Sequence, residues 1–486
     1  MTIKQPVEVC MMDFATLCDN GATLQLDHYQ RPYVWDRHKV NQLLEDLDEF
    51  RHSGNGQKVY YLGTLLLHRN DEKKARYVID GQQRLSTLAV LYHTLHNKLP
   101  KGLEFHYRSP ISARNLRVAR KLMSEHRESA LEPSIVEQLC FTVITVERED
   151  LAFTFFDTQN FRGVPLKATD LLKAYHLRAV NGPNVRHVES LQQICARRWE
   201  HVQMAGPRRQ DCEQQDFAPE LFQFYLWRAR NWRGNKKMER EDHDSLLEAF
   251  QQQSVGGGEI DEIPLYPGYH NQFANSLKLQ SSDDYRLALN PLQISGSAAN
   301  LPFTLRQPIH KGICFFLYAQ KYASLLDALL YQENTCHELE AFREFYRRVV
   351  RANAYYLQEL FNLALLMYVD RFGYQHLLTF AVGLELVLGG LRLEKSYIFK
   401  ESPLKYLRDA PYNLLDEICG AYRPQEVMAF LRSEIERSKG YGNAVSIVLS
   451  KGVQGRYLNA LLDYFNLDDI PEGDSWVLKG WLGMEK

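Results

Sequence analysis

The pattern of strands and helices changes near residue 180, and this change constrains the fold more than any other feature of the sequence. Before it, short runs rich in branched and aromatic residues, at 59–68, 73–79 and 140–148, alternate with helical stretches. Such runs predict β-strands, because branched and aromatic side chains pack well on a pleated surface. After it, apolar residues recur with the spacing of amphipathic helices. We therefore predict an α+β protein, in which an α/β domain at residues 1–180 is followed by a larger, mostly α-helical domain at residues 181–486.

The second domain is expected to contain long amphipathic helices. The predicted segments are residues 187–201, 216–230, 310–331, 337–370, 374–391, 412–419 and 424–438. Residues 251–270 are rich in glycine and proline, so we place a candidate internal boundary there. The most apolar stretch, residues 377–391, contains Glu385 and is shorter than the roughly 20 residues that span a membrane. It predicts a buried core helix, and we expect no membrane segment.

Composition narrows the class of protein. Hydrophobic residues make up 45% of the 486-residue chain and charged residues 24%, which is typical of a soluble globular protein. The formal net charge of -2 excludes a protein that coats DNA through its overall charge, so nucleic-acid contacts would depend on local basic patches. The eight cysteines are single and form no CxxC pair, so we expect reduced thiols and no structural zinc. The N-terminus lacks the pattern of a signal peptide, and we expect a cytoplasmic protein.

One join between a predicted strand and a predicted helix indicates a binding site. Residues 77–95 read YVIDGQQRLSTLAVLYHTL, and the residues DGQQR occupy the corner. Gly81 lets the backbone approach a ligand closely, and the free N–H groups of the following helix favour an anion. Arg84 adds a planar fork of donors that suits phosphate oxygens. The corner therefore indicates a phosphate site, with an ordinary helix start as the plainer alternative.

The remaining residues of the corner are compatible with both interpretations. Gln82 and Gln83 can donate hydrogen bonds to a phosphate, a sugar hydroxyl or a base edge. Asp80 would repel a phosphate unless a cation lies between them, which indicates either a divalent metal or an N-cap role. In the plainer alternative, Asp80 caps the helix while Gln82 and Arg84 face solvent.

Two further segments carry related residue types. Residues 155–178 read FFDTQNFRGVPLKATDLLKAYHLR, a break between helices followed by a helix start. The residues there that suit a pocket for an anion and a metal are Asn160, Arg162, Gly163 and Asp170. A capped helix-loop-helix is the alternative. Residues 29–35, YQRPYVW, place Arg31 next to Tyr33 among other aromatic residues, which suits stacking on a base and equally suits a packed aromatic loop.

Together these segments resemble the GmrS-type (GmrSD-like) family, whose N-terminal domain has a ParB/sulfiredoxin-like fold. The matching stretches are YQRPYVW with LLEDL, YYLGTLLL followed by YVIDGQQRLSTLAVL, and FFDTQNFRGVPLKATDLLKA. The resemblance covers residues 1–180, and QPIHKGICFFLYAQKY at residues 307–322 resembles a segment in the helical half of such proteins. It implies a nucleotide-binding domain that hydrolyses an NTP with Mg²⁺ and serves in modification-dependent restriction or other defence against phage.

The resemblance also assigns roles to individual residues. The residues implied to be catalytic are Asp80, Gln83 and Arg84. Those implied to bind the nucleotide are Gly81, Gln82, Asn160, Arg162, Gly163, Asp170, Arg31 and Tyr33. Asp80 and Asp170 are implied to hold Mg²⁺.

The chain departs from many relatives in one respect, because it shows no His-Asn-His nuclease constellation. His310, His337 and His376 are isolated in the sequence. We therefore expect a separate nuclease or effector subunit, and a homo-oligomer is left open. The leading expectation is an NTPase that gates a DNA-targeting effector. The alternatives are a non-catalytic nucleotide- or DNA-binding switch, and a DNA nuclease with an unrecognised site.

Basic stretches are the candidate contacts to DNA. On one predicted helix Arg114, Arg117 and Lys121 share a face, which suits a row of phosphates. A second stretch interleaves tryptophans with arginines that include Arg228, Arg230 and Arg233. Aromatic residues among arginines can stack on bases, and they can equally anchor a helix in the core.

Overall fold

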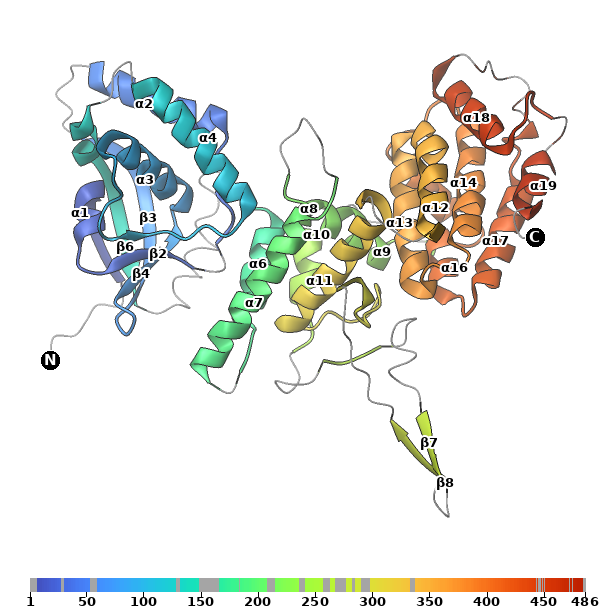
Figure 1. The fold of residues 1–486 in the computed structure, drawn as a ribbon, viewed down its shortest axis with the longest axis horizontal. Helices are drawn as coiled ribbons and strands as arrows, with labels where there is room; N and C mark the ends of the chain where they lie inside the picture. Colours follow the sequence, from blue (N-terminus) through green and yellow to red (C-terminus); the bar gives the residue numbers. More distant parts are fainter. Residues whose placement is uncertain are drawn as a thin grey trace. The chain divides into compact units, whose positions relative to one another are not determined.

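The protein is described by a computed structural model, in which the chain divides into two compact units, Met1–Leu177 (unit 1) and Arg178–Lys486 (unit 2) (Figure 1). The described residues are 7–27, 30–52, 59–127, 132–147, 166–182, 184–207, 215–235, 241–256, 263–266, 277–281, 285–289, 298–332, 337–442, 444, 447, 449, 451–471, 473 and 475–483.

Unit 1 is built on a six-stranded mixed sheet with the order β1-β6-β3-β4-β2-β5. The strands are β1 (Val7–Asp13), β2 (Thr23–Leu26), β3 (Tyr60–Asn70), β4 (Ala75–Asp80), β5 (Leu103–Glu104) and β6 (Leu139–Val146). β3 pairs antiparallel with β4 and parallel with β6, and β4 pairs parallel with β2. Because β4 is an inner strand, the backbone that leads into the corner at residues 80–84 has a neighbour on each side.

Helices cover this sheet and bury its apolar side chains. They are α1 (Phe14–Asp19), α2 (Arg37–His52), α3 (Gln82–His96), α4 (Pro110–Arg127) and the short 3-10 helix η1 (Pro133–Gln138), and α6 (Ala168–Arg178) follows them in the sequence. α3 lies across the sheet in Figure 1, and α4 packs against both α3 and α2. Leu85, Leu88 and Leu91 of α3 are buried in the same core as Leu65 and Val78 of the sheet. Burial of each such side chain contributes about 1.5–3 kcal/mol, so the sheet fixes the helix that follows the corner.

Unit 2 is mostly helical. Its α-helices are α7 (Val185–Met204), α8 (Ala218–Glu220), α9 (Arg228–Asn231), α10 (His243–Leu247), α11 (Ile313–Leu326), α12 (His337–Arg348), α13 (Tyr355–Phe372), α14 (Leu377–Glu394), α15 (Ser402–Asp409), α16 (Leu414–Gly420), α17 (Pro424–Arg437), α18 (Gly452–Phe465) and α19 (Ser475–Gly483). Its π-helical and 3-10 segments are η2 (Leu221–Trp227), η3 (Glu248–Gln252), η4 (Ala298–Asn300), η5 (Asp327–Tyr331) and η6 (Val350–Ala352). An antiparallel hairpin joins β7 (Leu277–Ser281) and β8 (Tyr285–Leu289).

One described helix, Ile313–Tyr331, is long and apolar enough to cross a membrane by length and composition alone, which is weak evidence. Inside unit 2 it packs as a core helix. Lys321 on this helix is fully buried, and its Nζ donates to Asp370 Oδ1 of α13 at 2.6 Å. Asp370 also accepts from the Tyr322 hydroxyl and, through Oδ2, from the Leu305 amide. Burial lowers the pKa of Lys321, while Asp370 opposes the shift.

The predicted architecture, a mixed α/β domain followed by a helical region, is confirmed. The predicted strands correspond to β3, β4 and β6, and the predicted core helix corresponds to α14. The structure differs in detail, because residues 337–370 form two helices and because the helical region contains the β7–β8 hairpin.

Candidate functional site

The turn from β4 into α3 depends on a glycine. Gly81 has φ of +100°, and a Cβ at this position would lie 2.2 Å from Leu65 Cδ2. Only glycine therefore fits the corner without strain. Gly81 occupies the N-cap position of α3, and no side chain caps the helix.

The uncapped start of α3 is suited to an anion. The first N–H groups of a helix have no intrahelical partner, and the helix dipole favours negative charge there. The plainer alternative required Asp80 to cap the helix, and the structure shows that it does not. Its Oδ2 instead accepts from Arg84 Nη2 at 3.3 Å, and its side chain stays 42% exposed.

Arg84 folds back onto β3 rather than facing solvent. Its Nη1 donates to the Leu62 carbonyl at 2.7 Å and its Nη2 to the Thr64 carbonyl at 2.6 Å. These carbonyls flank Gly63, where the register between β3 and β6 shifts. A Cβ at Gly63 would lie 2.7 Å from Arg84 Nη1. Burial lowers the pKa of the guanidinium, and nearby Asp80 opposes this shift.

The two glutamines hold a distant extended segment, residues 30–35, which we call the strap. Gln82 Nε2 donates to the Arg31 carbonyl at 2.9 Å. Gln83 Nε2 donates to the Pro32 carbonyl at 3.1 Å, and Gln83 Oε1 accepts from the Val34 amide at 2.8 Å. Since a carboxamide carries both a donor and an acceptor, it can satisfy a main chain that has no strand partner. The glutamines therefore position the strap.

Tyr33 lies in the core. Its side chain is fully buried, and its hydroxyl lies 2.8 Å from Thr87 Oγ1. Ser112 Oγ accepts from its amide, and Asn115 Nδ2 donates to its carbonyl. Burial raises the pKa of Tyr33 to about 12. The expectation that Tyr33 forms a pocket wall is therefore corrected, because its ring anchors the strap and presents no surface to a ligand.

The start of α6 meets the other end of the strap. Lys173 Nζ donates to the Gln30 carbonyl at 2.8 Å, and Gln30 Nε2 donates to the Val78 carbonyl at 2.7 Å. Burial raises the pKa of Asp170, and the charge of Arg31 is the largest opposing influence. Arg31 therefore lies near enough to Asp170 for its charge to act on that carboxyl, and their sharing of one nucleotide site stays a prediction. The predicted residues Asn160, Arg162 and Gly163 lie outside the described residues.

Two buried polar atoms near these elements lack a partner among the described residues. They are Gln82 Oε1 and Thr169 Oγ1. A buried acceptor or donor without a partner costs about 1–3 kcal/mol, so such atoms point to a further hydrogen-bonding group. Gln82 is in the first turn of α3, so one unmet hydrogen bond lies at the corner.

The described residues contain no group of three His, Cys, Asp or Glu side chains that could hold a metal by themselves. Mg²⁺ is commonly held by one or two carboxylates, with water and substrate phosphates completing its shell. The exposed carboxylate of Asp80 fits that pattern. Asp170 fits it less well, because burial disfavours its charged form.

Residues that sequence reasoning missed are those that fix the strap from outside the corner. Gln30, at the start of the strap, donates to the Val78 carbonyl of β4, and Ser112 and Asn115 of α4 bond to the main chain of Tyr33. The sequence signal for Ser112 and Asn115 was that they are small polar residues on the amphipathic helix α4, which could have indicated hydrogen bonds to a neighbouring main chain.

The candidate DNA contacts divide into two groups. On α4, Arg117 and Lys121 are exposed and Arg114 is half-buried, and the predicted contact of the three with phosphates stays a prediction. Arg228, in contrast, is 4% exposed and pairs with Glu241 and Glu359.

The prediction that Arg228 and Arg230 face DNA is wrong. Arg228 is buried between acidic partners, and Arg230 Nη1 donates to two main-chain carbonyls. Trp227 and Trp232 beside them are buried as core anchors. Of the three arginines, Arg233 is the one that is exposed in the described residues.

Comparison with known families follows the division into two units. No curated protein matches the chain. Residues 14–177 match the family described as GmrSD restriction endonuclease, N-terminal domain, and residues 191–445 match a family of unknown function, DUF7834. The chain therefore belongs to the DUF7834 family over more than half of its length, and it carries a GmrSD restriction endonuclease N-terminal domain.

Proposed function

We propose that this chain is the component of a prokaryotic GmrSD-type restriction system that binds and hydrolyses a nucleoside triphosphate with Mg²⁺. It acts in the cytoplasm and gates a separate DNA-targeting effector. The family match of residues 14–177 supports the restriction setting. The uncapped N-terminus of α3 carries the nucleotide site, because half-exposed Asp80 precedes it and the free buried oxygen of Gln82 lies in its first turn.

The residues of the corner have two kinds of role in this proposal. The first-turn N–H groups of α3 hold phosphate oxygens, and Asp80 holds the metal, which supplies charge neutralisation at the phosphates. Gln82 Oε1 accepts from a hydroxyl or amino group of the nucleotide. Gln83 and Arg84, whose polar groups bond to main chain, position the strap and the bulge of β3. Arg31 and Asp170 line the same site, with Asn160, Arg162 and Gly163 as further nucleotide contacts.

The test is phosphate release from ATP, GTP, CTP and UTP with Mg²⁺, comparing wild type with Asp80→Asn. Asp80 has one polar partner among the described residues, so the substitution removes the metal ligand with little structural change. We expect turnover to fall about a hundredfold, equivalent to about 2.7 kcal/mol in transition-state stabilisation. Glu72→Gln, which neutralises an exposed carboxylate in the β3–β4 turn, is the matched control and should leave turnover unchanged.

Equal turnover in wild type and Asp80→Asn would contradict the assigned role of Asp80. A non-catalytic switch is the second candidate, and one observation favours it. The Arg84 guanidinium is occupied by two carbonyls and Asp80, so the corner offers no free arginine to a transition state. Nucleotide binding without phosphate release by wild type would establish the switch and reject hydrolysis.

A further inference from the structure

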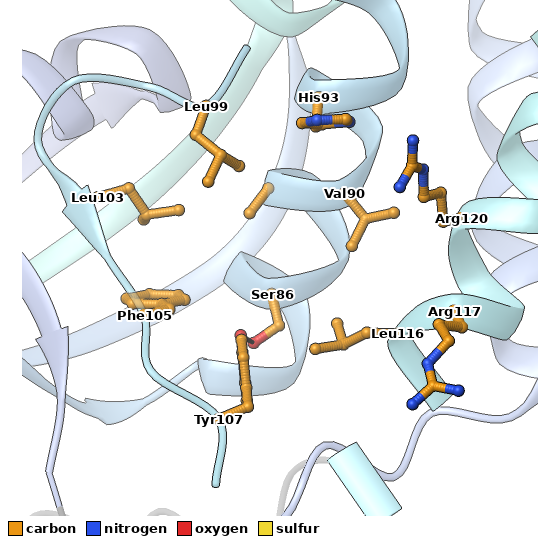
Figure 2. Close-up of a pocket in the computed structure, with 11 residues that line it drawn as sticks. Ser86, Val90, His93, Leu99, Leu103, Phe105, Tyr107, Leu116, Arg117 and Arg120 are labelled. Carbon is orange, nitrogen blue, oxygen red and sulfur yellow. Dashed lines mark hydrogen bonds between the residues drawn. The ribbon is translucent and has the colours of Figure 1, made fainter. Parts of the chain in front are cut away.

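A cavity of about 290 Å³ opens between α3, α4 and the segment that follows β5 (Figure 2). Figure 2 shows Ser86, Val90 and His93 on α3, with Leu103 and Phe105 on one side and α4 on the other. Small-molecule pockets usually measure about 300–1,000 Å³, so this cavity is at the lower end of the range. It admits one ring system with its substituents rather than a helix or a long chain.

The walls of this α3–α4 cavity are apolar and partly aromatic. The rings of Phe105 and Tyr107 pack edge to face, with centroids 6.3 Å apart. The Tyr107 hydroxyl donates to Ser86 Oγ, which in turn donates to the Gln82 carbonyl at 2.6 Å. These bonds hold the tyrosine ring in place. A fixed aromatic wall is suited to contact with a planar ring, and such stacking is tolerant of base identity.

The cavity also has a cationic side. Arg117 and Arg120 line it from α4, three residues apart and therefore on one face of the helix (Figure 2). Both are exposed, and neither makes a hydrogen bond or ion pair within the described residues. The guanidinium groups of Arg84 and Arg228, in contrast, form hydrogen bonds or ion pairs with other residues of the protein. Two planar guanidinium groups without partners in the described residues, beside an apolar wall, suit the oxygens of a phosphate.

We propose that the α3–α4 cavity binds one nucleotide unit, with its base against Phe105 and Tyr107 and its phosphate on Arg117 and Arg120. The unit is a free mononucleotide or one nucleotide of a DNA strand, which present the same base and phosphate. Inorganic phosphate would contact only the two arginines, and a neutral apolar ligand would contact only the apolar walls. An anion with a planar ring contacts both the arginines and the walls. The proposal is independent of the corner, since it requires neither a triphosphate nor a metal.

Photo-crosslinking with 5-iodo-deoxyuridine probes tests the proposal, because the adduct can be mapped to a peptide by mass spectrometry. The full chain is irradiated, without Mg²⁺, with the 5′-monophosphate or with a single-stranded oligonucleotide that contains one iodinated base. We expect an adduct on the peptide that contains residues 102–108. An adduct from the monophosphate identifies a free nucleotide as ligand, and an adduct from the oligonucleotide alone identifies a DNA strand. No adduct there from either probe would overturn the proposal.

Matched variants separate the cavity from general charge attraction. Arg117→Gln with Arg120→Gln should weaken binding of the crosslinking probe by at least about tenfold, because charge-assisted hydrogen bonds are lost. The control, Lys39→Gln with Lys101→Gln, removes two exposed charges that do not line the cavity, and it should stay within about twofold of wild type. Equal losses in both double variants would overturn the proposal.

A second pair of variants keeps the test decisive if the arginine variant folds poorly. Leu99 lines the cavity and is 54% exposed, so it tolerates a polar substitution. Leu99→Glu adds a negative charge to the cavity lining, which disfavours any anionic ligand there, and should lower the adduct yield. Leu99→Lys removes the same apolar surface without adding a negative charge, and this variant should still form the adduct. The same adduct yield from both variants would contradict an anionic ligand in the cavity.

Discussion

At the scale of single residues, Gly81 has the most restricted conformation in the corner. Its φ of +100° is disfavoured for any residue with a side chain, and the neighbouring Leu65 leaves no room for a Cβ. Gly21 in the same unit shares a positive φ but has open space around it. A comparison of alanine substitutions at the two glycines therefore distinguishes the cost of backbone strain from the cost of a steric clash.

We expect Gly81→Ala to destabilise unit 1 more than Gly21→Ala. Gly21→Ala should cost about 1–2 kcal/mol, which is the strain of a left-handed conformation. Gly81→Ala should cost about 1–3 kcal/mol more, because Leu65 or the backbone must move. Urea unfolding followed by circular dichroism measures both values. Equal losses would show that the corner relaxes freely, and it would then be a poor scaffold for a phosphate site.

The sequence predicted where the polar residues of the corner lie but not what they contact. Gln82 and Gln83 were expected to reach a ligand or solvent, yet they bond to main chain about 50 residues earlier in the sequence. Arg84 likewise bonds to carbonyls of β3. Pattern reasoning detects neighbours on one helix or strand, and these partners are brought close only by the sheet.

At the scale of elements, the strap is an extended segment that relies on side chains for its hydrogen bonds. Gln83 from α3, Asn115 from α4 and Lys173 from α6 each bond to its main chain. The position of Arg31 beside Asp170 depends on this arrangement. The strap therefore connects the helices of unit 1 to the candidate nucleotide site.

We expect Gln83→Leu to loosen the strap. The substitution leaves the Val34 amide and the Pro32 carbonyl without partners, which should cost about 1–3 kcal/mol. Hydrogen–deuterium exchange should become at least about tenfold faster for the Val34 amide, because its acceptor is lost. Gln42→Leu, on the exposed face of α2, is the control and should leave this exchange rate unchanged. Unchanged protection in Gln83→Leu would mean that the strap holds its position without Gln83.

The strands that sequence reasoning missed are those with weak patterns. β1 is an edge strand in which the apolar residues Val9 and Met11 are exposed. Its sequence therefore lacks the alternation of apolar buried and polar exposed residues that predicts a strand. β2 and β5 were also missed, because they have four and two residues, too few for a clear periodicity. The predicted strands β3, β4 and β6 are inner strands, and their apolar runs reflect burial on both faces.

At the scale of the whole molecule, the chain has two compact units with different chemistry in their interiors. Unit 2 contains a buried carboxyl that the helical pattern could not explain. Glu385 of α14 is 1% exposed, and Asn353 Nδ2 donates to its Oε1 at 2.6 Å. Asn353 lies in the break between α12 and α13, where a single long helix was predicted. This contact joins residues 32 positions apart in sequence, which is why neither the break nor the buried acid followed from periodicity.

Glu385 should make the stability of unit 2 depend on pH. Burial raises its pKa from 4.5 to about 8, and hydrogen bonds from Asn353 and Tyr457 oppose the shift. Between these two values the folded state keeps a proton that the unfolded state has released, so the free energy of unfolding should fall as pH rises. The slope should approach about 1.4 kcal/mol per pH unit. Glu385→Gln stays neutral and should lose this slope.

Urea unfolding at pH 5 and pH 8.5, followed by tryptophan fluorescence, measures the effect in the full chain, because five of its six tryptophans lie in unit 2. Relative to wild type, Glu385→Gln should gain stability at the higher pH. Glu436→Gln neutralises an exposed glutamate of α17 and should keep the wild-type slope. Since the shift arises from burial alone, parallel pH profiles for wild type and Glu385→Gln would mean that water reaches this carboxyl and that unit 2 is less tightly closed around α14.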